Sequence, residues 1–100
     1  MPGQSDLDHH LASLRDRLPW LAERFHVRRL GVFGSRVRRE EHPESDLDLL
    51  VAFDEIPSLL TFLKLENELS DLLGVKVDLV MEDTLKPSIG ERIRREVVPV

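Results

Sequence analysis

The chain has 100 residues, of which 14 are Lys or Arg and 19 are Asp or Glu, so its formal net charge is −5. An acidic chain of this kind does not coat nucleic acid through a basic surface. The absence of Cys excludes disulfides, Cys-ligated metal sites and thiol chemistry. Because no apolar run approaches the ~20 residues that span a bilayer, we expect one cytoplasmic domain over residues 1–100 that binds neither nucleic acid nor membrane directly.

The first predicted element is an amphipathic helix over about residues 5–25, which precedes a core over about 26–100. Its apolar residues recur at intervals of three and four, as on one face of a helix; they are Leu7, Leu11, Leu14, Leu18, Leu21 and Phe25. Pro19 lies inside this pattern and predicts either a kink or a second short helix that begins near it. The stripe is typical of a core face or of a seam that contacts a partner.

Two strands follow the helix and are separated by a polar segment. Residues 27–33 (VRRLGVF) predict a first strand that ends at Gly34. Residues 36–45 are polar and charged and predict a short helical turn and a loop. Residues 46–53 (DLDLLVAF) predict the second strand.

The remaining residues predict a helix, a third strand and a last helix. The helix begins at Pro57-Ser58 and ends at about Leu73, before Gly74, which suits the left-handed conformation of a helix C-terminus. We expect its buried face to contain Leu59, Phe62, Leu63, Leu69, Leu72 and Leu73. A strand over 75–81 (VKVDLVM) and a helix over about 87–96 complete the chain. This order of elements predicts an α/β (α+β) fold with a small sheet.

Two aspartates stand close together where the second strand begins. Asp46 and Asp48 are two residues apart, so their side chains project to the same face of the strand, roughly 6.6 Å apart along it. Two neighbouring carboxylates repel each other unless a cation or solvent offsets their charge. Mg²⁺, a hard cation that prefers carboxylate oxygen, is the natural occupant. The alternative is that both aspartates are solvated residues at a strand end.

The turn after the first strand is a candidate phosphate site. Gly34 lets backbone amides approach an anion closely, and Ser35, Arg36 and Arg38 carry side-chain donors suited to phosphate oxygens. A Gly-Ser pair alone is a common turn. If the two strands are antiparallel, the turn lies beside the two aspartates, because the end of one strand is then next to the start of the other.

A third carboxylate, Asp78, interrupts the apolar run of the third strand. It shares a face with Lys76 and Val80, opposite Val77, Leu79 and Met81. It is either a third member of the same site or part of the polar face of an edge strand. Three carboxylates from two strands beside a phosphate turn favour two-metal phosphoryl or nucleotidyl transfer, in which the ions stand ~3.5–4 Å apart.

The stretch GSRVRREEHPESDLDLLVAF resembles the minimal nucleotidyltransferase (MNT) domain of the DNA polymerase β superfamily. The signature of that family is Gly-Ser, about ten residues, Asp-x-Asp and a later Asp, and the resemblance extends over roughly residues 25–100. It implies the nucleotidyltransferase fold, with a small mixed β-sheet packed with helices. It also implies transfer of a nucleoside monophosphate from an NTP to an acceptor, with release of pyrophosphate.

The resemblance implies a role for each motif residue. Gly34 and Ser35 would hold the triphosphate, and Asp46 and Asp48 would bind two Mg²⁺ ions. Asp78 would bind one of these ions and act as the base that activates the acceptor hydroxyl.

The length of the chain makes it most similar to the stand-alone MNT proteins of prokaryotes. These are antitoxins of HEPN-domain ribonuclease toxins, and they transfer AMP from ATP to a tyrosine of the toxin. This chain contains no Tyr, so its acceptor must lie on another chain. The resemblance therefore implies an ATP-dependent protein adenylyltransferase whose partner is a HEPN toxin.

Two alternatives remain open. The chain could neutralise its partner by binding alone, which the apolar stripe of the first helix favours. The net charges of +4 in residues 1–39 and −9 in residues 40–100 favour the same alternative. The other alternative is nucleotidyl transfer to a small molecule, which requires an acceptor pocket.

Overall fold

The computed structural model describes residues 6–34, 37 and 46–100. Within these residues the chain forms the following elements: α1 (Asp6–Phe25), β1 (Val27–Phe33), β2 (Leu47–Phe53), α3 (Leu59–Leu73), β3 (Val77–Met81), the 3-10 helix η1 (Glu82–Thr84), α4 (Pro87–Glu96) and β4 (Val98–Pro99). The order of these helices and strands agrees with the predicted one, and the sequence pattern did not indicate η1 or β4. Apart from residue 37, the helical turn and loop predicted over 36–45 lie outside the described residues. No helix in this described part is long and apolar enough to cross a membrane.

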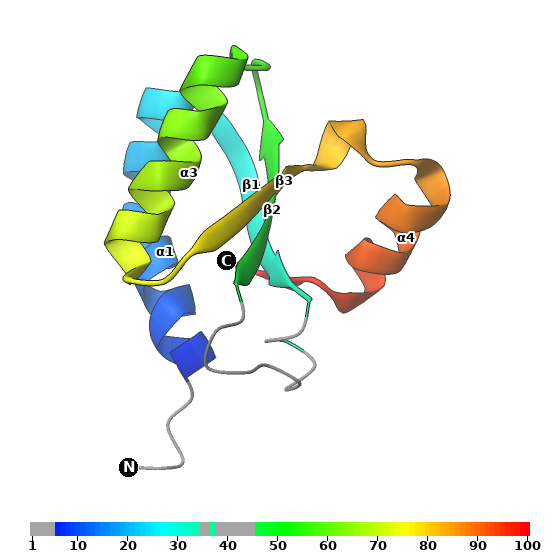
Figure 1. The fold of residues 1–100 in the computed structure, drawn as a ribbon, viewed down its shortest axis with the longest axis horizontal. Helices are drawn as coiled ribbons and strands as arrows, with labels where there is room; N and C mark the ends of the chain where they lie inside the picture. Colours follow the sequence, from blue (N-terminus) through cyan, green and yellow to red (C-terminus); the bar gives the residue numbers. More distant parts are fainter. Residues whose placement is uncertain (1–5, 35–36, 38–45) are drawn as a thin grey trace.

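The strands form one mixed sheet in the order β3-β2-β1-β4. β1 is antiparallel to both β2 and β4, whereas β2 and β3 are parallel. β2 therefore lies inside the sheet and β3 lies at an edge. Figure 1 shows α1 and α3 side by side on one side of the sheet, with α4 on the other. This arrangement confirms the expected α/β fold with a small mixed sheet.

The core lies between the sheet and the helices α1 and α3. The predicted stripe of α1 belongs to it, because Leu14 and Leu21 are fully buried and the other four apolar residues are buried or partly buried. The stripe is thus a core face and does not form a seam for a partner. The helix continues through the exposed Pro19 to Phe25, so the expectation of a second short helix was wrong.

The helix α3 has the predicted ends but a different buried face. Ser58 is its N-cap and accepts a hydrogen bond from the Thr61 N–H at 3.2 Å, and Gly74 ends it with φ of 70°. The buried residues are Leu65, Leu69 and Leu73.

Leu59 and Leu63 are 73% and 44% exposed, so their assignment to the core was wrong. A helix turns by about 100° per residue, which places Leu63 almost opposite Leu65. The buried residues follow steps of four along the helix, and the two leucines lie outside that row.

Candidate functional site

The sheet brings three of the predicted site residues together. The antiparallel register pairs Phe33 with Asp48, and the parallel register pairs Asp48 with Asp78. Neighbouring strands lie about 4.8 Å apart, and residues in register carry their side chains on the same face. Asp48 and Asp78 are therefore neighbours on one face, and Gly34, which follows Phe33, begins the turn beside them. The antiparallel pairing on which the predicted site depended is confirmed.

That face is the one opposite the helices α1 and α3. Leu47, Leu49 and Val51 are fully buried in the core. Since successive residues of a strand point to opposite faces, Asp48 points to the side on which α4 lies. Asp48 is half-buried, whereas Asp78 on the edge strand is exposed. The exposure of Asp78 fits both a binding role and the polar face of an edge strand.

Gly34 is required for its backbone conformation and for the space it leaves. Its φ is +88°, a region that side chains disfavour. A Cβ at this position would overlap Oδ2 of Asp48 and lie 3.0 Å from its Cγ. The turn and the carboxylate are therefore in close contact.

The Gly34 N–H donates a hydrogen bond to Oε2 of Glu96 at 2.8 Å. Glu96 ends α4, 62 residues further along the chain, and was not among the predicted site residues. No local spacing could have indicated this contact, because it depends on how the chain returns to β1.

The three candidate carboxylates suit Mg²⁺ in their chemistry. Asp46, Asp48 and Asp78 offer only carboxylate oxygens, the ligands that this cation prefers. As they stand, the residues described contain no group of three or more His, Asp or Glu side chains placed to hold a metal ion.

Three predicted nucleotide-binding residues, Ser35, Arg36 and Arg38, lie outside the described residues. Their roles remain predictions. The fourth predicted nucleotide-binding residue, Gly34, is described and lies next to Asp48.

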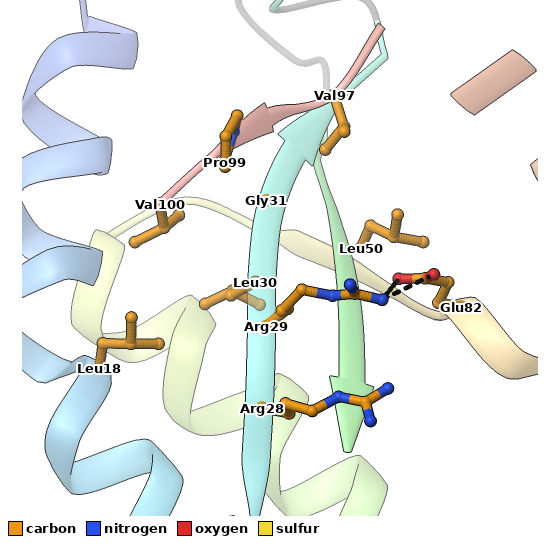
Figure 2. A pocket seen from close by; sticks show the side chains of 10 residues that line it. All are labelled: Leu18, Arg28, Arg29, Leu30, Gly31, Leu50, Glu82, Val97, Pro99 and Val100. Carbon is orange, nitrogen blue, oxygen red and sulfur yellow. Dashed lines mark hydrogen bonds and ion pairs between the residues drawn. The ribbon is translucent and has the colours of Figure 1, made fainter. Parts of the chain in front are cut away.

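A cavity of about 160 Å³ lies along β1 (Figure 2). It is lined by Leu18, Arg28, Arg29, Leu30, Gly31, Leu50, Glu82, Val97, Pro99 and Val100. An ion pair stands beside it, in which Arg29 Nη2 lies 3.0 Å from Glu82 Oε2. None of the site residues that the structure describes lines this cavity, and it is smaller than the ~300–1,000 Å³ of typical ligand pockets. We therefore do not assign the nucleotide to it.

Comparisons with known proteins agree with this geometry. Residues 19–99 match the family model described as Polymerase beta, Nucleotidyltransferase. The chain is 58% identical over 80 residues to the protein adenylyltransferase MntA of Thermococcus cleftensis, covering 80% of this chain and 81% of that protein. It is also 43% identical over 88 residues to a Methanocaldococcus jannaschii protein assigned as a protein adenylyltransferase, covering 87% of this chain and 90% of that one.

Solved structures show the same fold. One, assigned as a minimal nucleotidyltransferase, is 40% identical with a TM-score of 0.78 and 98% of each chain covered. Another is the tri-AMPylated Shewanella oneidensis HEPN toxin in complex with its MNT antitoxin. It has a TM-score of 0.60 at 18% identity and covers 94% of this chain and 68% of that one, which is a likeness of fold alone. The chain belongs to the polymerase β nucleotidyltransferase family and is an enzyme of its minimal nucleotidyltransferase branch.

Proposed function

We propose that this nucleotidyltransferase transfers AMP from ATP to a tyrosine of a HEPN-domain toxin and thereby acts as its antitoxin. The structural observation that carries the proposal is the contact of the Gly34 turn with Asp48, next to Asp78. The naming of the 58% identical relative as a protein adenylyltransferase supports AMP as the group transferred. The absence of Tyr in this chain supports an acceptor on a partner.

Each residue of the site has a separate task in this proposal. The turn at Gly34 holds the triphosphate, and Asp46, Asp48 and Asp78 would hold two Mg²⁺ ions. Bound Mg²⁺ supplies stabilisation of the negative charge on the phosphate oxygens. The acceptor oxygen forms a bond to the α-phosphorus while the bond from that phosphorus to pyrophosphate breaks. Asp78 accepts the proton of the acceptor hydroxyl.

The test combines the chain, ATP, Mg²⁺ and the HEPN protein encoded beside it, and weighs the HEPN protein by mass spectrometry. The wild type is expected to add AMP-sized increments, whereas Asp48→Asn and Asp78→Asn abolish them. Asp83→Asn is the matched control, because Asp83 is an exposed acid of η1 outside the site. Replacing ATP by GTP, CTP or UTP determines the base preference. Full transfer by both site variants would refute the catalytic roles.

A second candidate function is neutralisation of the toxin by binding alone. It is favoured by four neighbouring apolar residues at the start of α3 that are 44–73% exposed: Ile56, Leu59, Leu60 and Leu63. Exposed apolar groups of this kind are typical of protein interaction sites. If Asp48→Asn neutralises the toxin as well as the wild type and Leu60→Asp does not, binding is the mechanism. If the mass of the toxin stays unchanged and AMP is found attached to a small molecule, that molecule is instead the acceptor.

A further inference from the structure

Glu96 occupies a place that helix stability does not explain. It is the last residue of α4 and is half-buried. The dipole of a helix disfavours negative charge at the C-terminus and favours cations such as Arg94 and Arg95, which precede Glu96. The carboxylate of Glu96 instead accepts the Gly34 N–H at 2.8 Å. A hydrogen bond to an ionised acceptor is stronger than one between neutral groups.

The pairing of the C-terminal strand brings Glu96 to this place. β4 is antiparallel to β1, with Val98 opposite Val32. Extending this register by two residues puts Glu96 opposite Gly34. The backbone of Glu96 is still helical and does not continue the ladder. Its side chain therefore takes the place that a strand carbonyl would have as acceptor for the Gly34 N–H.

Close packing holds the segment after α4 against β1. A Cβ at Gly31 would lie 2.5 Å from Cγ2 of Val97 and 3.2 Å from the carbonyl oxygen of Val98. Further along, the Val100 N–H donates to the carbonyl oxygen of Leu30 at 2.9 Å. The hydrogen bond from Val100 to Leu30 and the tight packing of Val97 on Gly31 thus fix the position of Glu96 relative to Gly34.

Gly34 is consequently bounded on two sides, by Glu96 at its N–H and by the side chain of Asp48 where a Cβ would stand. We propose that Glu96 is a positioning residue, which holds the Gly34 N–H and so fixes Gly34 next to Asp48, at the start of the segment proposed to bind the triphosphate. The Gly34 N–H then holds the backbone of Gly34 in place and is not itself a phosphate donor. A binding residue that is held in place beforehand loses less freedom when the ligand binds. The expected effect on nucleotide binding rests on the proposed function, whereas the hydrogen bond between Glu96 and Gly34 does not.

The test uses the full chain with Glu96→Ala, Glu96→Gln and Glu91→Ala. Glutamine keeps a side-chain oxygen that accepts the Gly34 N–H, and alanine does not. Glu91 is the matched control, because it is an exposed acid of the same helix that pairs only with the neighbouring turn through Arg95 at 2.8 Å, as far as the described contacts show. The first measurement is the hydrogen exchange of the Gly34 amide by NMR. The second is the affinity for AMP-PNP in the presence of Mg²⁺.

We expect Glu96→Ala to remove the protection of the Gly34 amide and to weaken AMP-PNP binding about tenfold, the order expected for one charge-assisted hydrogen bond. Glu96→Gln is expected to keep most of the amide protection and most of the affinity for AMP-PNP. Glu91→Ala is expected to change neither of these two quantities. Because glutamine removes the charge and keeps the acceptor, this rescue separates the hydrogen bond from the charge of the carboxylate, and the affinity for AMP-PNP separates positioning of the site from a loss of stability.

Other outcomes overturn the proposal. Tighter AMP-PNP binding by Glu96→Ala would mean that the carboxylate competes with phosphate. Unchanged binding, or equal losses in the glutamine and alanine variants, would show that the hydrogen bond does not position the turn. If Glu96→Ala does not fold, the exchange of the Gly34 amide still tests the hydrogen bond to Glu96. Rapid exchange in the wild type would show that this hydrogen bond does not form, whereas protection retained in Glu96→Gln supports it. If the wild type does not bind AMP-PNP, the proposed function fails, and the exchange comparison alone decides whether Glu96 holds the turn.

Discussion

Replacing Gly34 by alanine has two effects: it strains the backbone, and it fills the space next to Asp48 that the glycine leaves open. The chain offers a matched control in Gly74, since both glycines have positive φ, at 88° and 70°. A Cβ at Gly34 would overlap the carboxylate of Asp48, whereas a Cβ at Gly74 would meet no heavy atom within 4 Å. The two substitutions therefore share the backbone strain, and only Gly34→Ala displaces a side chain of the site.

The magnitudes follow from this difference. A left-handed conformation costs an alanine about 1–2 kcal/mol, so both variants should unfold at lower temperature by roughly 4–8 °C for each kcal/mol. The overlapping atom at Gly34 is the end of the Asp48 side chain, which can turn away, and the Asp48 Cβ at 3.2 Å must shift by only a few tenths of an ångström. The added cost in stability is therefore small, while the carboxylate leaves its place. A misplacement of about 1 Å at a reacting centre can lower a rate about 100-fold.

The assay measures thermal unfolding and AMP transfer to the HEPN partner for both variants. We expect similar losses of stability and a fall in transfer of at least about 100-fold for Gly34→Ala alone. Transfer of AMP by Gly34→Ala at the wild-type rate would contradict this prediction. An equal loss of transfer in Gly74→Ala would also contradict it, since backbone strain alone would then account for the effect.

Three further predictions concern stability and can be checked by urea or thermal unfolding. Leu69→Ala should cost about 2–5 kcal/mol, because Leu69 is 1% exposed, whereas Leu60→Ala, at a residue 67% exposed, should change the free energy of unfolding by less than about 0.5 kcal/mol. Ser58→Ala removes the N-cap of α3 and should cost about 1 kcal/mol; no change would show that its bond to the Thr61 N–H does not stabilise the helix. Glu82→Gln weakens ion pairs with two arginines that are 63% and 57% exposed, so we expect a loss of only about 0.5–1 kcal/mol that disappears in 1 M salt.

The sequence predicted most of the elements because their signals are local. The first strand and the last helix begin and end at the predicted residues, and the second strand begins one residue later than expected. Gly74 ends α3 in the left-handed conformation for which glycine is suited. Where the prediction failed, in the buried face of α3, the sequence carries more apolar residues than the helix can bury. Which of them face the sheet depends on how the helix is rotated, and only tertiary packing determines this.

The candidate site was predictable to the extent that it lies in local motifs. The spacing from Gly34 to Asp48 and the position of Asp78 in a strand can be read from the sequence, and the register of the sheet places them together. Glu96 could not be found in this way. Its role depends on β4, which has only two residues and no sequence pattern of its own. Such a strand forms because the edge of β1 that does not pair with β2 offers backbone groups for hydrogen bonding.

The directions of the four strands explain why distant segments meet at one site. β1 is antiparallel to β2 and β4, and β3 runs parallel to β2. The C-terminal end of β1 therefore lies at the same end of the sheet as the N-terminal ends of the other three strands. Gly34 directly follows β1, Asp48 and Asp78 are the second residues of β2 and β3, and Glu96 stands just before β4. The topology of the sheet thus brings Gly34, two carboxylates and Glu96 to one end of the sheet, although these residues are far apart in the sequence.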